Sequence, residues 1–321
     1  MIYVTQIIMG LTQKETIVIV GYGWVGQANA LAFSHAGYKV FYFDVQKPSL
    51  KYTDKYSKLY GTIPPLSKVL EKDAPDTWYI VCVGDKVLPD GEQDISAIRK
   101  ALESLRDAKG GVVLRSTIIP GHLQNLVFDY YVPEFLHEKK AVEESIYPQY
   151  FIVGKRSQKK WPSFFEVWDK MAAKVFHGTP EEASYIKYLS NTWNAIRIAF
   201  VNEFGNAISH PTDKEKLAQN EKVIDFFFER KSYLRYGRSY GGHCLPKDTH
   251  AFLTWHKKQG RDVSLIEGMH KSNLFHQEIE KKHTHLPQWF SEWSRPIISG
   301  RVALKALRAS IFRNIGKISR I

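Results

Sequence analysis

The sequence predicts an α/β fold: a Rossmann-type, doubly wound parallel sheet followed by an all-helical central domain. Three observations support this class. Apolar strand-like runs alternate with helical stretches in the first half, a glycine-rich turn follows the first run, and long helical stretches replace this alternation from about residue 179. The apolar runs are continuous, which indicates strands that are buried on both faces of a sheet.

The expected strands all precede the change to helices. They cover residues 16–20, 39–43, 78–83, 111–114 and 150–153. The first long helix is expected over roughly residues 180–209, with Ala183, Ile186 and Leu189 near one face. Because the chain is too long for one core, we predict a Rossmann-like domain over 1–178, a helical central domain over 179–290 and a basic tail over 291–321.

The glycine-rich turn, Gly21-Tyr-Gly23-Trp-Val-Gly26, lies between the first strand and a helix that Gly37 is expected to end. Here the first glycine permits a tight turn, the second lets the backbone approach a pyrophosphate, and the third allows close packing of helix on strand. The helix N-terminus then faces the phosphates. We predict a dinucleotide site; the alternative is a glycine turn that binds nothing.

An acidic residue, Asp44, ends the second strand 23 residues beyond the first glycine (44 − 21), close to the spacing expected for a carboxylate on a ribose hydroxyl. This carboxylate would accept hydrogen bonds from the adenosine ribose and repel a 2′-phosphate. We therefore expect NAD, and not NADP, as the cofactor.

Composition restricts the remaining possibilities. A formal net charge of +12 on 321 residues favours anionic partners without choosing among them. The two cysteines, Cys82 and Cys244, lack ligand-like spacing, so we expect neither a disulfide framework nor a metal site. Residues 1–10 lack the basic flank of a signal peptide and no apolar stretch approaches the ~20 residues of a bilayer span, which predicts a cytoplasmic protein.

The last segment, residues 293–321, contains Lys and Arg but no Asp or Glu. Such a basic amphipathic tail could bind a partner chain or an anionic membrane surface, or it could be a solvated helix with a disordered end. Nucleic-acid binding is not expected, because the sequence has neither a recognisable module nor a basic stripe interleaved with aromatic residues.

Four further segments carry motifs in a fixed order. They are Arg115-Ser-Thr117-Ile-Ile-Pro-Gly121, Val132-Pro-Glu134-Phe-Leu-His-Glu138, Lys187-Tyr-Leu-Ser-Asn191 leading to Asn202-Glu203, and Gly241-Gly-His-Cys244-Leu-Pro-Lys-Asp248-Thr. Together they resemble the UDP-glucose/GDP-mannose dehydrogenase family, over about residues 16–273. The resemblance implies that two NAD molecules oxidise the C6 alcohol of a nucleotide sugar to a carboxylate, through a thioester on a cysteine.

The resemblance assigns Cys244 as the nucleophile, because a thiolate can trap an aldehyde as a thiohemiacetal and prepare it for a second oxidation. Lys187 matches the family lysine that assists proton transfer. Asn191 lies one helical turn further on, so both side chains could reach one oxygen. Asp248, at i+4 from Cys244, matches the carboxylate that helps to activate the hydrolytic water, with Thr117 as a partner.

Glu134 and Glu138 match the family's active-site glutamates, and one of them could act as a base. Both could instead merely favour a helix N-terminus. His243 could tune the adjacent thiol, whereas Cys82 is expected to be buried in a strand. The implied substrate site comprises Glu134, Phe135, Leu136, Lys187, Asn191, Arg235, Tyr240 and Gly241. The implied cofactor site comprises Gly21, Gly23, Trp24, Val25, Gly26, Asp44, Val83 and Thr117.

The sequence departs from the family at several points. Family members usually continue into a second α/β domain of roughly 100–150 residues, which this chain is expected to lack. Arg235-Tyr-Gly-Arg-Ser239 stands where the family has Asn-Pro-Ser-Phe-Gly, Val132 replaces an Asn, and Val83-Gly-Asp-Lys86 replaces Val-Pro-Thr-Pro. These changes affect the parts expected to recognise the nucleotide and to lie near the cofactor.

The predicted function is oxidation of a UDP-glucose-like nucleotide sugar to its uronate for polysaccharide biosynthesis. Two alternatives remain: a non-catalytic NAD-binding or regulatory relative, and a β-hydroxyacid-type dehydrogenase, whose chemistry needs a lysine but no thiol. The predicted oxidation of a nucleotide sugar is favoured over both alternatives, because the sequence retains Cys244, Lys187, Asn191 and Asp248 together. The central helix is also expected to form a homodimer, because it carries surplus apolar residues, namely Trp193, Ile196, Phe200 and Phe204.

Overall fold

The computed structural model of the chain describes residues 15–137, 140–210, 212–228, 234, 236–242 and 244–282. The predictions for residues 1–10, Glu138, Arg235, His243 and the basic tail lie outside the described residues. The described residues up to Trp193, together with Lys247–Val263, form one compact unit, here called the sheet unit. Asn194–Pro246 and the described residues from Ser264 form a second, the helical unit. The domain boundaries at 178 and 290 stay a prediction.

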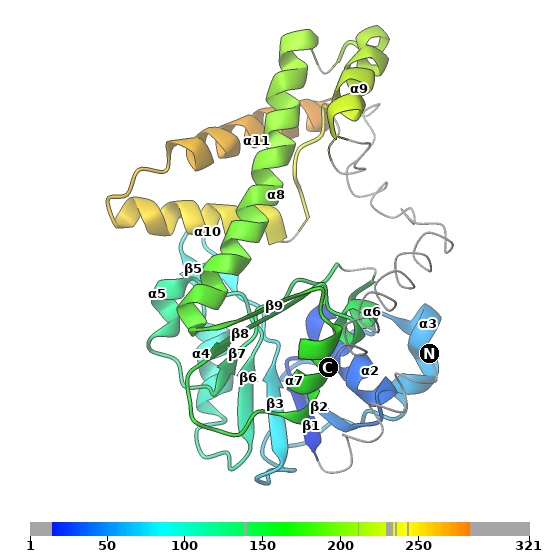
Figure 1. Cartoon of the computed structure of the whole chain (residues 1–321), viewed down its shortest axis with the longest axis vertical. Coiled ribbons are helices and arrows are strands. Elements are labelled where there is room, and N and C mark those ends of the chain that lie inside the picture. Colours follow the sequence, from blue (N-terminus) through cyan, green and yellow to red (C-terminus); the bar gives the residue numbers. More distant parts are fainter. Residues whose placement is uncertain are drawn as a thin grey trace, which may run out of the picture. The chain divides into compact units, whose positions relative to one another are not determined.

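The sheet unit contains a seven-stranded sheet in the order β2-β1-β3-β6-β7-β8-β9, counted over the described residues (Figure 1). Neighbouring strands are parallel, except that β7 and β8 pair antiparallel. The strands are β1 (Thr16–Val20), β2 (Lys39–Phe43), β3 (Thr77–Val81), β6 (Gly111–Leu114), β7 (Tyr130–Tyr131), β8 (Tyr150–Lys155) and β9 (Lys174–Gly178). A separate antiparallel hairpin consists of β4 (Lys86–Val87) and β5 (Gln93–Asp94).

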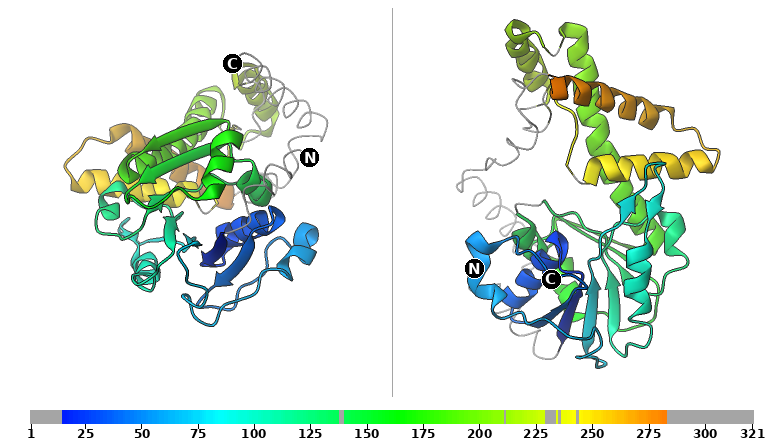
Figure 2. Two further views of the ribbon diagram at one scale, coloured as in Figure 1. Left: turned by 60° about the horizontal axis from the view of Figure 1, so that its bottom comes forward. Right: turned by 180° about the vertical axis from the view of Figure 1, so that it is seen from behind.

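Both faces of the sheet are buried, because successive side chains of one strand enter opposite layers. In β1, Ile17 and Ile19 pack in one core and Val18 and Val20 in the other. The first core includes residues of α2 (Trp24–His35), α6 (Ala141–Ile146) and α7 (Ser163–Met171), and the second includes residues of α4 (Ser96–Glu103) and α5 (Pro120–Leu123). Figure 2 shows the sheet between these helices.

Three further helices of the sheet unit complete its description. They are α3 (Thr53–Tyr60), the first half of α8 (Pro180–Ile208) and most of α10 (Cys244–Lys258). The helical unit contains the second half of α8, α9 (Lys214–Phe228) and α11 (Ser264–Lys282). Its core consists of aliphatic and aromatic side chains, including Ala195, Ile198, Val201, Tyr236 and Tyr240.

The structure confirms the predicted fold class. The expected strands are present, although β3 ends at Val81, so that Cys82 follows the strand and does not lie inside it. The long helix was predicted to within one residue of its end. Four of the described strands were not predicted: β4, β5 and β7 have two residues each, and β9 is mostly exposed and therefore lacks a continuous apolar run. No helix in the described part of the chain is long and apolar enough to span a membrane.

Candidate active site

The glycine turn has the backbone geometry that its spacing predicts. Gly21 follows β1 with φ +88°, and its N–H donates to the carbonyl oxygen of Phe43, at 2.9 Å. A Cβ on Gly26 would lie 2.0 Å from the Gly21 carbonyl oxygen, whereas a Cβ on Gly23 would meet nothing within 4 Å. Gly26 thus permits close helix packing, and the space beside Gly23 is open to a ligand.

Three loops meet at the carboxyl edge of the sheet. Val83, in the loop after β3, lies beside the turn, because a Cβ on Gly21 would come within 3.0 Å of the Val83 backbone nitrogen. The hydroxyl of Ser116, after β6, donates to the Val83 carbonyl oxygen at 2.6 Å. Open α/β sheets bind ligands at this edge, where the strand order reverses.

Asp44 follows β2 beside this turn, as predicted. One carboxylate oxygen accepts the backbone N–H of Tyr22 at 2.6 Å, and the other accepts that of Gln46 at 2.8 Å. Trp24, the first residue of α2, is 41% exposed, and the ammonium of Lys51 lies 5.1 Å from its ring centroid. An aromatic surface and a fixed carboxylate therefore flank the turn.

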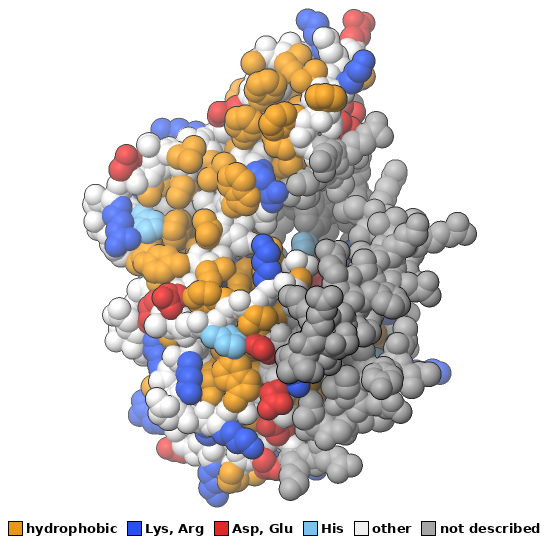
Figure 3. Space-filling view, in the orientation of Figure 1, with side chains coloured by type: hydrophobic (Ala, Val, Ile, Leu, Met, Phe, Trp, Pro, Cys, Tyr) orange, Lys and Arg blue, Asp and Glu red, His pale blue; other side chains and the backbone are white. Residues whose placement is uncertain are grey.

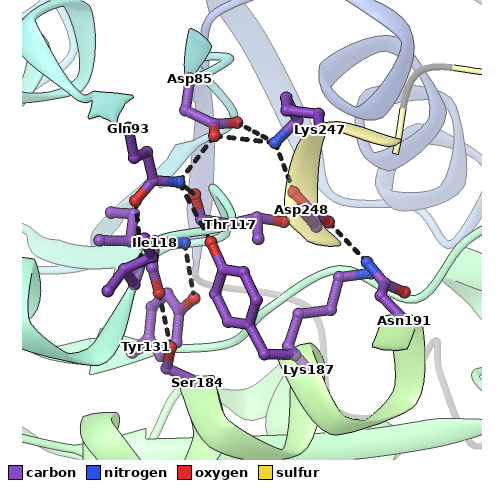
Figure 4. Close-up of polar contacts among 12 residues, drawn as sticks. Asp85, Gln93, Thr117, Ile118, Tyr131, Ser184, Lys187, Asn191, Lys247 and Asp248 are labelled. Atoms are coloured by element: carbon purple, nitrogen blue, oxygen red, sulfur yellow. Dashed lines mark hydrogen bonds and ion pairs between the residues drawn. The ribbon is translucent and has the colours of Figure 1, made fainter. Parts of the chain in front are cut away.

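A second group of polar side chains joins α8 to α10 within the sheet unit (Figure 4). The amide of Asn191 donates to one carboxylate oxygen of Asp248 at 2.5 Å, and Lys187 donates to the Asn191 amide oxygen at 3.5 Å. All three are buried. The ammonium of Lys187 also lies 4.8 Å from the ring centroid of Phe135, a cation–π contact. The structure therefore brings together four residues that the resemblance assigned to one site.

Lys247 connects this group to the loop after β3. Its ammonium donates to Asp248 at 2.6 Å and to the two carboxylate oxygens of Asp85 at 2.7 and 2.8 Å. Burial lowers the pKa of Lys247, but the carboxylates of Asp248 and Asp85 outweigh that effect and hold the pKa above its ordinary value. Lys247 is therefore a charged ammonium shared between two acids.

Gln93, in β5, fixes both Asp85 and the loop after β6. Its amide nitrogen donates to Asp85 at 2.7 Å and to the Thr117 carbonyl oxygen at 3.0 Å, and its amide oxygen accepts the Ile119 N–H at 2.8 Å. Thr117 is thus connected through its backbone to the same network as Asp248. The structure places it near the group to which the resemblance assigned it (Figure 4).

Glu134 lies in an irregular segment between β7 and α6 and is held by Arg115. The arginine donates from Nε at 2.9 Å and from a terminal nitrogen to the same oxygen of Glu134, and both side chains are largely buried. The other oxygen accepts the N–H of Phe135 at 2.9 Å. Leu136 follows and packs partly against the sheet core.

The two cysteines have different environments. Cys82 is half-buried, and burial raises the pKa of its thiol to about 12, although the Arg115 guanidinium opposes this shift. Such a thiol stays protonated at neutral pH and is a poor nucleophile. Cys244 is exposed and begins α10, where the N–H groups of a helix N-terminus favour negative charge.

Two predicted substrate residues lie in the helical unit. The side chain of Tyr240 is fully buried, and its backbone exchanges hydrogen bonds with the amide of Asn273, at 2.7 and 3.0 Å. Gly241, which is partly exposed, follows it. A substrate role for these residues stays a prediction, and Gly241 offers the more accessible surface.

Sequence reasoning did not assign roles to Asp85, Gln93, Arg115 or Lys247. Lys247 lies in the cysteine motif, but the resemblance assigned a catalytic role only to its neighbour, Asp248. Asp85 was visible only as a departure from the family pattern, and its partner is 162 residues away along the chain. Gln93 had no distinguishing pattern.

The fold and this site define a Rossmann-type α/β protein with a helical central domain. Residues 181–274 match the UDP-glucose/GDP-mannose dehydrogenase family, central domain. The chain is 26% identical to the GDP-mannose 6-dehydrogenase of Pseudomonas aeruginosa, over 76% of this chain, and 28% identical to the UDP-glucose 6-dehydrogenase TuaD of Bacillus subtilis, over 85%. The chain spans 64% of the length of each of these two relatives.

Solved structures show the same fold. The UDP-glucose dehydrogenase of Pyrobaculum islandicum matches with a TM-score of 0.71 and 23% identity, over 84% of this chain and 72% of that chain. The UDP-D-ManNAc dehydrogenase of Pyrococcus horikoshii matches with a TM-score of 0.68 and 19% identity, over 83% and 70%.

Proposed function

We propose that this protein is an NAD-dependent dehydrogenase that oxidises the C6 alcohol of a UDP-glucose-like nucleotide sugar to the uronate. The observation that carries the proposal is the buried contact chain of Lys187, Asn191 and Asp248, with Asp248 one helical turn beyond the exposed Cys244 in α10. These are the residue types needed to move protons, to stabilise an oxyanion and to form a covalent intermediate. The relatives named as nucleotide-sugar dehydrogenases support the same substrate class.

The residues around the glycine turn fit a dinucleotide. Gly23 leaves open space at its Cβ position, Gly26 lets α2 begin directly beside the turn, and Asp44 supplies a fixed acceptor. Bound NAD would accept a hydride in each of two oxidation steps. The negative charge of Asp44 would disfavour the 2′-phosphate of NADP.

The chain's own residues divide the remaining chemistry. Lys187 and Asn191 hold the substrate oxygen and stabilise its negative charge. The Cys244 thiolate bonds to the aldehyde carbon, and the second oxidation converts this adduct to a thioester. In hydrolysis, water bonds to the carbonyl carbon, the carbon–sulfur bond breaks, and Asp248 takes the proton from water. Glu134 forms a buried ion pair with Arg115, so we assign it the role of holding residues 134–136 in place.

We also propose a homodimer through the second half of α8. Phe200 and Phe204 are 55% and 50% exposed with ring centroids 6.2 Å apart, and Phe227 in α9 is 77% exposed. Hydrophobic side chains gather over this part of the helical unit (Figure 3). Exposed aromatic groups of this kind are typical of a subunit interface.

One experiment tests the proposed activity. The protein is incubated with NAD and a panel of UDP- and GDP-sugars, while NADH is followed by absorbance and Cys244 by intact-protein mass spectrometry. We expect NADH with at least one sugar nucleotide, and loss of sustained NADH turnover in Cys244→Ser although NAD still binds. If none of the sugar nucleotides yields NADH and Cys244 carries no adduct, the proposal is wrong. That result would favour the non-catalytic NAD-binding alternative.

A further inference from the structure

Asp85 is a buried acid that neither the motifs nor the resemblance assigned to the site. It lies in the loop after β3, where the sequence has Val83-Gly-Asp-Lys86 and the family usually has an uncharged Val-Pro-Thr-Pro. Its side chain is only 7% exposed, and both of its oxygens accept hydrogen bonds from Lys247. The departure from the family pattern thus introduces a charge directly into the polar network of α8 and α10.

The charges of this network balance only when Asp85 is included. Lys187 and Lys247 are cationic, and Asp248 is a single anion between them. Asp85 supplies the second negative charge. Because an uncompensated buried charge is costly, neutralising Asp85 would leave one excess positive charge and would favour rearrangement of the remaining groups.

Asp85 also determines where Lys247 can point. The Lys247 ammonium lies between the two acids, 2.7 Å from Asp85 and 2.6 Å from Asp248, so neither carboxylate holds it alone. Asp85 is itself fixed by Gln93, which is tied to the backbone at Ile119. In this arrangement the second carboxylate oxygen of Asp248 is not bound by Lys247 and accepts a hydrogen bond from the Asn191 amide nitrogen, at 2.5 Å.

We propose that Asp85 is a positioning residue for Asp248: it holds Lys247 away from exclusive pairing with Asp248 and so keeps that carboxylate oriented. This inference rests on the proposed function, in which Asp248 takes a proton from the water that hydrolyses the Cys244 thioester. Without Asp85, Lys247 turns fully onto Asp248, and the carboxylate loses the alignment that it needs to take up that proton. Hydrolysis slows, whereas the first oxidation, which does not use Asp248, continues.

The test compares Asp85→Asn with Asp85→Glu and with a matched control, Glu92→Gln. Glu92 lies one residue before β5 and pairs with Lys258 of the same helix α10, but that pair is about half exposed. Each full-length variant is mixed with NAD and the sugar nucleotide that the wild type oxidises. Stopped-flow absorbance gives the NADH burst and the steady-state rate, and quenched mass spectrometry gives the fraction of Cys244 that carries an acyl group.

We expect Asp85→Asn to lower kcat about tenfold or more, since small misplacements of a catalytic group have effects of this size. KM should change little, and both the NADH burst and the acyl-Cys244 fraction should rise. Asp85→Glu should restore the rate to within a few-fold, and Glu92→Gln should resemble the wild type. An unchanged kcat in Asp85→Asn, or a fall in kcat without acyl-Cys244 accumulation, overturns the inference.

A failure of the proposed function would look different, because the wild type itself would then form neither NADH nor an adduct. Folding is checked separately by thermal denaturation of Asp85→Asn, of Lys247→Met and of the double variant. The two single changes should be non-additive, since the side chains are in contact. If Asp85→Asn does not fold, Asp85→Ser takes its place, because its hydroxyl retains a partner for Gln93, and the same outcomes decide.

Discussion

The guanidinium of Arg115 is held between the carboxylate of Glu134 and the ring of Trp168. It donates two hydrogen bonds to one oxygen of Glu134, and its central carbon lies 4.8 Å from the Trp168 ring centroid. The arginine is 6% exposed, so its charge has little access to water. The ion pair therefore fixes the segment that carries Phe135, whose ring contacts Lys187.

Replacing Glu134 by Gln should destabilise the protein strongly, because the neutral amide leaves the buried Arg115 charge without a counterion. We expect a loss of about 3 kcal/mol in the free energy of unfolding, measured by urea denaturation. The matched change is Glu103→Gln, which removes the exposed partner of Arg106 and should cost less than about 1 kcal/mol. Equal effects of the two changes would contradict the role given to burial here.

The two glycines of the turn should separate folding from cofactor binding. Gly26→Ala places a methyl group 2.0 Å from the Gly21 carbonyl oxygen, so the melting temperature should fall and NAD binding should be lost. Gly23→Ala meets no protein atom within 4 Å, so stability should be retained while NAD binding, measured by calorimetry, weakens at least tenfold. Undiminished NAD binding by Gly23→Ala would argue against a pyrophosphate beside this residue.

The stability of the helical unit should depend on pH through His276. This side chain is fully buried, and burial, with a smaller effect of His210, lowers its pKa to about 4. Below pH 6.5 the unfolded chain therefore takes up a proton that the folded chain does not. The contribution of neutral His276 to the free energy of unfolding is fully present above pH 6.5 and decreases as the pH falls toward 4. Between pH 7 and 5 the free energy of unfolding should fall by about 2 kcal/mol.

The contribution of His276 is isolated by comparison with His276→Gln. Unfolding free energies of both proteins are measured by urea denaturation at pH 7 and at pH 5. The wild type should lose more stability than the variant over this interval, by the amount given above. Parallel losses in the two proteins would show that other groups cause the acid sensitivity.

A charge within the aromatic group on α8 should oppose self-association. Phe200→Asp would place a carboxylate among exposed aromatic rings and weaken a dimer at least tenfold, as expected for a central interface residue. Size-exclusion chromatography with light scattering measures the mass against concentration. Val127→Asp is the control, since Val127 is 73% exposed in the sheet unit. A monomeric wild type, or equal behaviour of both variants, would refute the proposed interface.

The parts of the fold that were predicted correctly are those with long or unusual local patterns. Continuous apolar runs such as Ile17–Val20 identify strands buried on both faces, and the 29-residue helix α8 has enough turns to be recognised. The edge strand β9 could not be recognised, because its exposed side chains do not form an apolar pattern. Two-residue strands such as β7 arise from pairing with a neighbour and have no local pattern.

The candidate site was predictable where motif residues are close in sequence, as for Lys187 and Asn191, or follow a known spacing, as for Asp44 after Gly21. The ion pair of Asp85 with Lys247 depends on how the loop after β3 and the helix α10 meet in the folded chain. No local sequence pattern indicates that this loop and this helix are in contact. The sequence could therefore show that Asp85 was unusual but not which side chain it binds.

The division of the chain within α10 limits how the protein can be taken apart. The backbone passes between the two units at residues 193, 246 and 263, so neither unit is a single continuous stretch. A fragment that stops after Trp193 would keep Lys187 and Asn191 but would lose Lys247 and Asp248. The polar network therefore requires both segments of the sheet unit, the residues up to Trp193 and Lys247–Val263. A recombinant fragment with only one of these segments would contain only part of the network.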